Sequence, residues 1–136
     1  MKGLGTNVLV RYLAQDDPDE SAIATAFIET QCTQDAPCFI NHITLCELVS
    51  VLEDSYRQDR ASIVSIIEQL LQVGQLAVLE PEIVWKALSD FKESNSGFSD
   101  HLIARVNQEA GCNVTMTLDK RAGQQPRYKL LGGALK

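Results

Sequence analysis

At 136 residues, the chain is long enough for one domain with a hydrophobic core and too short for two domains of ordinary size. Its composition, 45% hydrophobic and 22% charged, excludes a disordered chain, and its net charge of −6 argues against a broad basic face for nucleic acid. An acidic pocket that recruits a cation is compatible with this charge, because the metal reverses the local sign. We expect no signal peptide and no membrane span, since no apolar stretch is long enough.

The first part of the chain predicts strands and helices in alternation. The segment Leu4–Leu13 is expected to be a short strand that turns into a helix. "DDPDES" predicts the next helix start, with Asp17 as the N-cap and Pro18 at the first helical position. The apolar face expected on this helix consists of Ala22, Ile23, Ala26 and Phe27. "PCFIN" is a second strand, and a helix is expected from about Thr44 to Tyr56.

The second part continues the alternation. Asp59 is expected to cap a helix that stops at Gly74, and "LAVLE" is a third strand. Pro81 opens another helix, and Ser99 is expected to cap the next one, which ends at Gly111. The apolar positions expected on that last helix are Leu102, Ile103 and Val106. "NVTMTL" is a fourth strand and "RYKLL" a fifth.

This alternation of short strands and helices predicts a single α/β domain over residues 1–136. The strands are expected to form one mostly parallel sheet of four or five strands, covered by helices on both faces as a three-layer α/β/α sandwich. Right-handed crossovers would place the carboxyl ends of all strands on one edge, where ligands and metals bind in such folds.

The four cysteines contain no C-x-x-C pair and have only two histidines to help them, which argues against a zinc site. A disulfide framework is not needed in a domain of this size. We therefore expect Cys32, Cys38, Cys46 and Cys112 to be buried free thiols in a reducing cytoplasm.

Several polar residues are expected at the strand-end edge. Glu47 falls in the first turn of the helix after "CFIN", Asp100 begins a helix, and Asp119 follows the fourth strand, while Thr6 and Asn7 follow the first. Carboxylates there can hold Mg²⁺ or Mn²⁺, which activates water for phosphodiester hydrolysis. Each acid also has a simpler reading, as a helix cap for Asp100, a solvated face for Glu47 and a turn residue for Asp119.

Four segments, "LGTNVLVRYL", "ITLCELV", "GFSDHLIA" and "TLDKRA", together resemble the PIN-domain ribonucleases in order and spacing. The resemblance is greatest to the VapC-type toxins of prokaryotic toxin–antitoxin pairs, and it covers the chain from residue 4 to residue 122. It implies a PIN fold with a Mg²⁺- or Mn²⁺-dependent endoribonuclease site.

The resemblance also implies roles for particular residues. Glu47, Asp100 and Asp119 match the acids that bind the metal. Thr6 and Asn7 match the polar pair after the first acid, with Asn7 orienting that acid or the substrate, and Thr117 matches a hydroxyl residue ahead of the last acid. The basic residues that could touch RNA phosphates, or be plain surface charges, are Arg11, Lys120 and Arg121.

Gly5 is where the sequence departs from the family pattern. Related toxins carry aspartate there, in "L-D-T-N", as the central metal ligand, so Gly5 is interpreted as a lost catalytic and metal-binding acid in an otherwise intact site. The alternative is a structural glycine, required by a positive φ or by tight packing at the strand end.

Two functions follow from the resemblance. The first is an endoribonuclease toxin, inactivated or impaired at Gly5, that cuts structured RNA such as transfer RNA. The resemblance implies a VapB-type antitoxin as its partner, operator DNA bound only through that antitoxin, a cytoplasmic location and a homodimer, whose surface we expect between Ile63 and Phe91. The second is a non-catalytic PIN module that binds RNA or a partner. A phosphatase or a flap-type nuclease would need further acids or a basic stretch that the sequence lacks.

Overall fold

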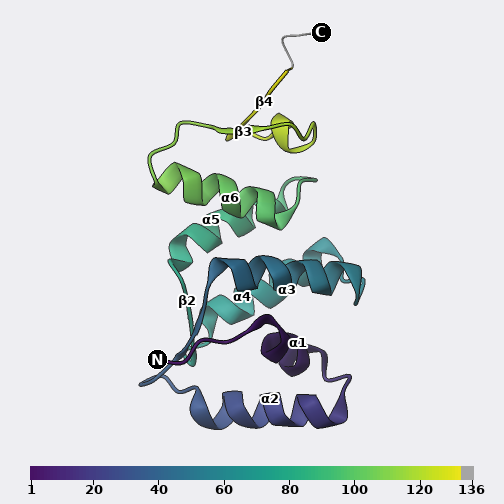
Figure 1. Ribbon diagram of the computed structural model, residues 1–136, viewed down its shortest axis with the longest axis vertical. Helices are drawn as coiled ribbons and strands as arrows, with labels where there is room; N and C mark the ends of the chain where they lie inside the picture. The colour runs from purple at the N-terminus through teal and green to yellow at the C-terminus, as the bar shows by residue number, and fades with distance from the viewer. Residues whose placement is uncertain (133–136) are drawn as a thin grey trace. The chain divides into compact units, whose positions relative to one another are not determined.

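The computed structural model describes residues 1–132, which form two compact units (Figure 1). The first unit, Met1–Leu79, contains α1 (Thr6–Ala14), α2 (Pro18–Gln31), β1 (Cys38–Ile40), α3 (His42–Asp54), α4 (Arg60–Gln72) and β2 (Leu76–Val78). The second unit begins at Glu80 and contains α5 (Pro81–Lys92), α6 (Phe98–Glu109), β3 (Thr115–Thr117), a 3-10 helix (Ala122–Gln124) and β4 (Tyr128–Leu130). In the described part of the chain, no helix has the length and apolar character that crossing a membrane requires.

The strands of the first unit run parallel. β1 pairs with β2 in the register Cys38↔Leu76 to Ile40↔Val78. On its other side, β1 is joined by the N-terminal segment through a parallel bridge between Gly3 and Phe39, and the Leu4 N–H donates to the Phe39 oxygen at 2.8 Å. Because both segments run the same way, α1 and α3 begin at the same edge of this small sheet.

The second unit has its own parallel pair, β3 with β4, in the register Thr115↔Tyr128 to Thr117↔Leu130. In the same unit α5 packs against α6 (Figure 1), and the rings of Phe91 and Phe98 meet edge to face at 5.9 Å. The predicted α/β class and parallel pairing are confirmed. Within the described residues the strands, each three residues long, form two parallel pairs in place of the expected single sheet of four or five strands.

Most of the predicted helix starts are confirmed. The carboxylates of Asp17 and Asp59 accept the backbone N–H groups of Glu20 and Ser62 at 3.0 and 2.8 Å, which satisfies donors that a helix end leaves open. The bond from the Ser62 N–H also lowers the pKa of Asp59, because it stabilises the charged carboxylate. Pro81 opens α5 as expected.

The expected cap Ser99 is wrong. α6 begins at Phe98 with Gly97 as its N-cap, so Ser99 lies inside the first turn. The buried ring of Phe98 explains the earlier start, because it belongs to the core of the second unit beside Phe91. At the other end, the left-handed Gly111 follows α6 as predicted, with a φ of 101°.

The end of α4 differs from the prediction in its mechanism. The helix stops at Gln72, and its C-cap Val73 has an extended backbone. Gly74 comes just after and is not among the left-handed glycines of residues 1–132. The helix therefore ends near the expected place without a glycine C-cap.

The apolar face predicted for α2 is wrong. The side chains that α2 buries are Ser21, Ala24 and Ile28, while Ile23 is 71% exposed. α2 packs against α1. On α6, likewise, Leu102 is buried as expected but Ile103 is 48% exposed. The spacing of apolar residues therefore predicts that these helices are amphipathic, but it does not determine which side chains face the core.

The cysteines also differ from the expectation of free thiols. Cys32 and Cys38 form a disulfide, with Cα atoms 5.3 Å apart. A turn brings them together, because the Thr33 N–H donates to the Ala36 oxygen at 3.2 Å and the Ala36 N–H donates to the Thr33 hydroxyl at 3.0 Å. Both disulfide cysteines are buried.

The other two cysteines are free thiols. Cys46 is half-buried, and burial raises its pKa, whereas Cys112 is exposed and not buried as expected.

Candidate functional site

Gly5 occupies the N-cap position of α1 in the first unit. Its φ of −83° and ψ of 162° are extended values that any residue adopts. A Cβ added at this position would meet no heavy atom within 4 Å, beyond the neighbouring residues. Neither backbone conformation nor packing requires glycine here, so the structural-glycine alternative is wrong.

An open pocket of about 560 Å³ lies beside Gly5. The residues that line it are Gly5, Thr6, Asn7, Val8, Glu47, Ser50 and Val51. The Thr6 hydroxyl donates to the Glu47 carboxylate at 2.6 Å, across 41 residues of sequence. The first unit therefore brings four of the predicted site residues together, because α1 and α3 start at the same sheet edge.

Glu47 lies further along its helix than expected. α3 begins at His42, with the Asn41 side chain accepting the Thr44 N–H at 2.8 Å, so Glu47 falls in the second turn and not the first. Its side chain is exposed and faces the pocket. The bond from Thr6 gives this carboxylate a fixed partner, which a purely solvated glutamate on a helix surface would lack.

Asp100 lies in the first turn of α6, in the second unit. Its carboxylate accepts a hydrogen bond from the buried Ser96 hydroxyl at 3.3 Å, and its backbone oxygen accepts one from the Tyr128 hydroxyl at 2.6 Å. A Cβ at Gly97 would lie 3.6 Å from the Asp100 carboxylate, an ordinary van der Waals contact. The carboxylate and the main chain of Asp100 are thus each held by a different part of the unit.

Asp119 follows β3 as predicted, and it also organises the turn there. One of its carboxylate oxygens accepts the backbone N–H groups of Arg121 and Ala122 at 2.8 and 3.0 Å, at the start of the 3-10 helix. The Thr117 hydroxyl accepts the Asp119 N–H at 3.0 Å. The turn reading of Asp119 is therefore correct.

The pKa of the Tyr128 hydroxyl depends on both of these aspartates. Its pKa is raised to about 12, chiefly by burial and further by the negative charges of Asp100 and Asp119. The Tyr128 hydroxyl also contacts Asp100 directly, through the hydrogen bond to its backbone oxygen.

The donors present are of the kind that Mg²⁺ or Mn²⁺ prefers, because they are carboxylate oxygens. Within residues 1–132, no group of three or more His, Cys, Asp or Glu side chains is close enough to hold a metal ion. Glu47 is the acid that lines the pocket of the first unit, and the open space at Gly5 lies in the same pocket. A carboxylate at position 5 would supply a second acid there.

The basic residues give little sign of a phosphate-binding role. Arg11 donates to Glu20 at 2.8 Å and to Asp16 at 3.3 Å. The hydrogen bond to Glu20 is the main cause that raises the pKa of Arg11. Lys120 and Arg121 are exposed in the turn after β3. Arg11 is thus engaged within the first unit, whereas Lys120 and Arg121 are exposed.

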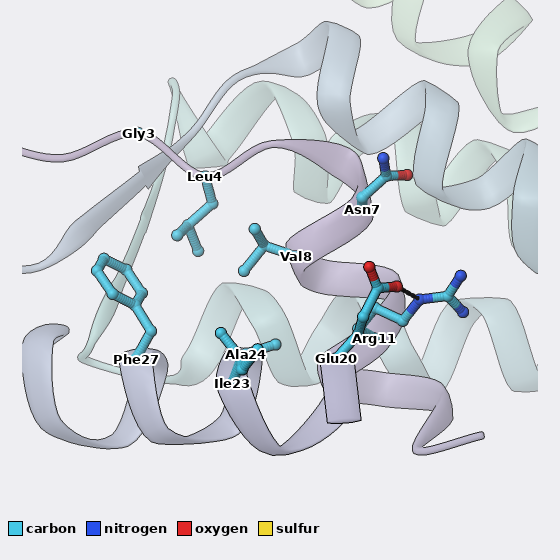
Figure 2. Close-up of a pocket in the computed structure, with 9 residues that line it drawn as sticks. All are labelled: Gly3, Leu4, Asn7, Val8, Arg11, Glu20, Ile23, Ala24 and Phe27. Carbon is cyan, nitrogen blue, oxygen red and sulfur yellow. Dashed lines mark hydrogen bonds and ion pairs between the residues drawn. The ribbon is translucent and has the colours of Figure 1, made fainter. Parts of the chain in front are cut away.

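A second pocket, of about 410 Å³, lies between α1 and α2 (Figure 2). Its wall is apolar, with Leu4, Val8, Ile23, Ala24 and Phe27, and the Arg11–Glu20 pair stands at its edge. Asn7 lines both pockets. The sequence does not predict this pocket, because Ile23 and Phe27 are expected on the apolar face of α2 that packs inward. Their spacing of four residues along the helix is the only sequence feature that points to the pocket.

One protein family matches most of the chain. A search of curated proteins found no match for the chain. The model of the PIN domain matches residues 4–128, a range that contains every candidate site residue of both units. The chain belongs to the PIN domain family.

Proposed function

We propose that this protein is a metal-dependent endoribonuclease of the VapC toxin type, in which Gly5 stands in place of a metal-binding aspartate and impairs activity. PIN domains are typically nucleases, and they usually depend on a divalent metal. The VapC-type assignment rests on the four sequence segments described above, and the PIN family match agrees with it at a coarser level.

The observation that carries the proposal is the geometry at Gly5. The backbone there is one that aspartate adopts readily, the space around it is open, and Glu47 lines the same pocket. An aspartate at this N-cap would also accept N–H groups at the start of α1, a position for which aspartate is among the best residues. The site thus accommodates an acid that the sequence lacks.

The proposal keeps the acids that the resemblance implies as metal ligands, which are Glu47 in the first unit, Asp100 and Asp119 in the second, and the acid that position 5 would carry. The ion, when bound, would activate water and stabilise the charge that develops on the phosphodiester. The other residues serve these acids: Thr6 holds the Glu47 carboxylate, and the Thr117 hydroxyl supports the turn at Asp119. Asn7, which lines the pocket, is placed to orient the substrate.

The proposed partners follow from the toxin assignment. Structured RNA such as transfer RNA is the proposed substrate, and a VapB-type antitoxin, binding operator DNA in complex with the toxin, is the proposed inhibitor. The net charge of −6 suits a basic antitoxin segment. A homodimer and a cytoplasmic location belong to the same proposal, although the Cys32–Cys38 disulfide weighs against a reducing compartment.

A second candidate function is a PIN module that binds RNA or a partner without cutting. Gly5 favours it, because a binding module has no need for the missing acid. Under this alternative, restoring the acid would give no cleavage.

The experiment that separates the two candidates is a cleavage assay on this chain and on Gly5→Asp. Substrates are total transfer RNA, an unstructured RNA and duplex DNA, each with Mg²⁺, Mn²⁺ or EDTA. We expect Gly5→Asp to cut RNA, transfer RNA foremost, only when a metal is present. Metal-independent cleavage would contradict the metal-dependent mechanism. No cleavage of any substrate would contradict the nuclease proposal and favour the binding module.

Thr6 provides a further prediction. In the Gly5→Asp background, we expect Thr6→Val to weaken Mn²⁺ binding by about 10-fold, because residues that orient a ligand carboxylate tune metal affinity. Thr6→Ser, which retains the hydroxyl bonded to Glu47 at 2.6 Å, should keep most of the affinity. Calorimetric titration with Mn²⁺ measures both, and equal affinities for Val and Ser would show that Thr6 does not support Glu47.

A further inference from the structure

The Cys32–Cys38 disulfide joins the end of α2 to the sheet of the first unit. Cys32 is the C-cap of α2, and Cys38 is the first residue of β1. β1 has the N-terminal segment on one side and β2 on the other. The residue after Cys38 binds the N-terminal segment, because the Phe39 N–H donates to the Lys2 oxygen at 2.7 Å. The disulfide therefore fastens α2 covalently to the strand that carries the N-terminal segment.

These two elements face each other across the apolar pocket between α1 and α2 (Figure 2). The N-terminal segment contributes Gly3 and Leu4 to the pocket wall, and α2 contributes Ala24 and Phe27. The distance between the two walls depends on how α2 is attached to the rest of the unit. The Cys32–Cys38 disulfide provides a covalent attachment at the end of α2.

The other attachments of α2 described so far are not covalent. At the start of the helix, Arg11 of α1 donates to Glu20 at 2.8 Å. Near its end, the Lys2 ammonium donates to the Gln31 side chain at 3.4 Å, in an exposed hydrogen bond. Exposed polar contacts of this kind contribute little to stability. Opening the disulfide therefore removes the strongest tie at the end of α2.

The disulfide is buried under a short turn. Cys32 and Cys38 are each 1% exposed, so a reductant reaches the sulfur atoms only when the turn between them opens. Residues 33–36 are exposed. Two hydrogen bonds between Thr33 and Ala36 close the turn, at 3.2 and 3.0 Å. Exposed segments with few bonds open locally, which gives a small reductant a route to the disulfide.

We propose that Cys32–Cys38 is a redox-sensitive clamp, which holds the end of α2 to β1 when oxidised and releases it when reduced, so that the apolar pocket widens. The reductant is a dithiol. One of its thiolates attacks a disulfide sulfur and forms a mixed disulfide, and its second thiol then displaces the other cysteine. The dithiol ends as its own disulfide, and its two electrons and two protons pass to Cys32 and Cys38.

This inference does not depend on the nuclease chemistry. It does account for a disulfide in a protein for which we propose a cytoplasmic location, because disulfides in reducing compartments are usually transient and either catalytic or redox-sensing.

The test uses the full chain with Cys46→Ala and Cys112→Ala, so that Cys32 and Cys38 are the only cysteines. This protein is studied after treatment with oxidised glutathione and again after treatment with dithiothreitol, with the free thiols counted each time. A further variant, which also carries Cys32→Ala and Cys38→Ala, represents the released state and cannot respond to either reagent.

Two measurements follow the clamp. The first is amide exchange at Thr33 and Ala36 in the turn, with the Ile63 amide at the start of α4 as the control. The second is the fluorescence of 1-anilinonaphthalene-8-sulfonate, which binds exposed apolar surface. Ile23→Ser marks the pocket, and Ile43→Ser is its matched control, since these side chains are 71% and 72% exposed and only Ile23 lines the pocket.

We expect reduction to speed exchange at Thr33 and Ala36 about 10-fold and to leave Ile63 unchanged. Dye fluorescence should rise several-fold, and this rise should be lost in Ile23→Ser and kept in Ile43→Ser. Oxidised glutathione should reverse both effects. The variant without Cys32 and Cys38 should behave as the reduced protein under all conditions.

Four results would overturn the proposal. Unchanged exchange in the turn after complete reduction would show that the disulfide holds nothing in place. An equal acceleration at Ile63 would show a general loss of stability and not a local release. A dye signal that rises equally in Ile23→Ser would place the released surface outside the pocket. A disulfide that resists dithiothreitol in the folded chain, or that does not form with oxidised glutathione, would exclude a redox-sensitive clamp.

Discussion

Replacing Gly5 by aspartate is expected to raise the rate of metal-dependent RNA cleavage by at least ~10²-fold, the scale on which a key charged or ligand group acts. The variant adds a carboxylate to a pocket that already contains Glu47, at a backbone position without strain and with no heavy atom in the way. Initial rates of RNA cleavage by the two proteins, at equal concentration and saturating Mg²⁺ or Mn²⁺, measure the effect.

Two control variants separate the charge from the mere presence of a side chain. Gly5→Ala fills the space, and Gly5→Asn has nearly the shape of aspartate and caps a helix as well, but carries no charge. We expect both to remain as inactive as the Gly5 protein. Activity of Gly5→Asn equal to that of Gly5→Asp would contradict a metal-binding role for position 5.

The second large effect is expected at Asp119. In the Gly5→Asp background, Asp119→Asn should reduce cleavage by about 10²-fold, because it removes a ligand charge. Stability should change little, since the amide oxygen of asparagine can still accept the N–H groups of Arg121 and Ala122. The cleavage rate and the urea unfolding midpoint, measured on the same sample, give both quantities.

The controls for Asp119 use its observed role in the turn. Asp119→Ala should lose activity and also about 1 kcal/mol of stability, as when a capping side chain is removed. Asp59→Asn is the matched variant, since Asp59 accepts a backbone N–H in the same way at the start of α4 and belongs to no predicted site. If Asp119→Asn cuts RNA as fast as Asp59→Asn, Asp119 is a turn residue and not a metal ligand.

The parts of the fold that sequence predicted well are those decided by local chemistry. Asp17, Asp59 and Pro81 start helices, and Gly111 ends one, because each acts on backbone groups within a few residues of itself. The parallel pairing of short strands separated by helices also followed from the order of the elements.

The predictions were wrong where contacts between residues distant in the sequence determine the structure. Gly97, and not Ser99, is the N-cap of α6, because the helix already includes Phe98, which belongs to the core beside Phe91. Ile23 is exposed because α2 turns Ala24 and Ile28 inward. The Cys32–Cys38 disulfide depends on a turn whose closure the spacing of cysteines alone does not indicate.

The candidate site likewise has residues that the sequence indicates and others that only the fold reveals. The resemblance located Gly5, Thr6 and Glu47, and the structure adds the bond from Thr6 to Glu47 and the open space at Gly5. Tyr128 had no sequence signal, because its bond to Asp100 depends on β4 returning beside β3.

The most direct test of the central claim, that Gly5 stands where a metal ligand belongs, is the Mn²⁺ affinity of three proteins: this chain, Gly5→Asp and Gly5→Asn. Binding measured by calorimetry does not depend on knowing the RNA substrate. The account predicts a dissociation constant 10- to 100-fold lower for Gly5→Asp, on the order of the effect of a ligand-supporting group, with the other two alike. Equal affinities for all three would contradict it.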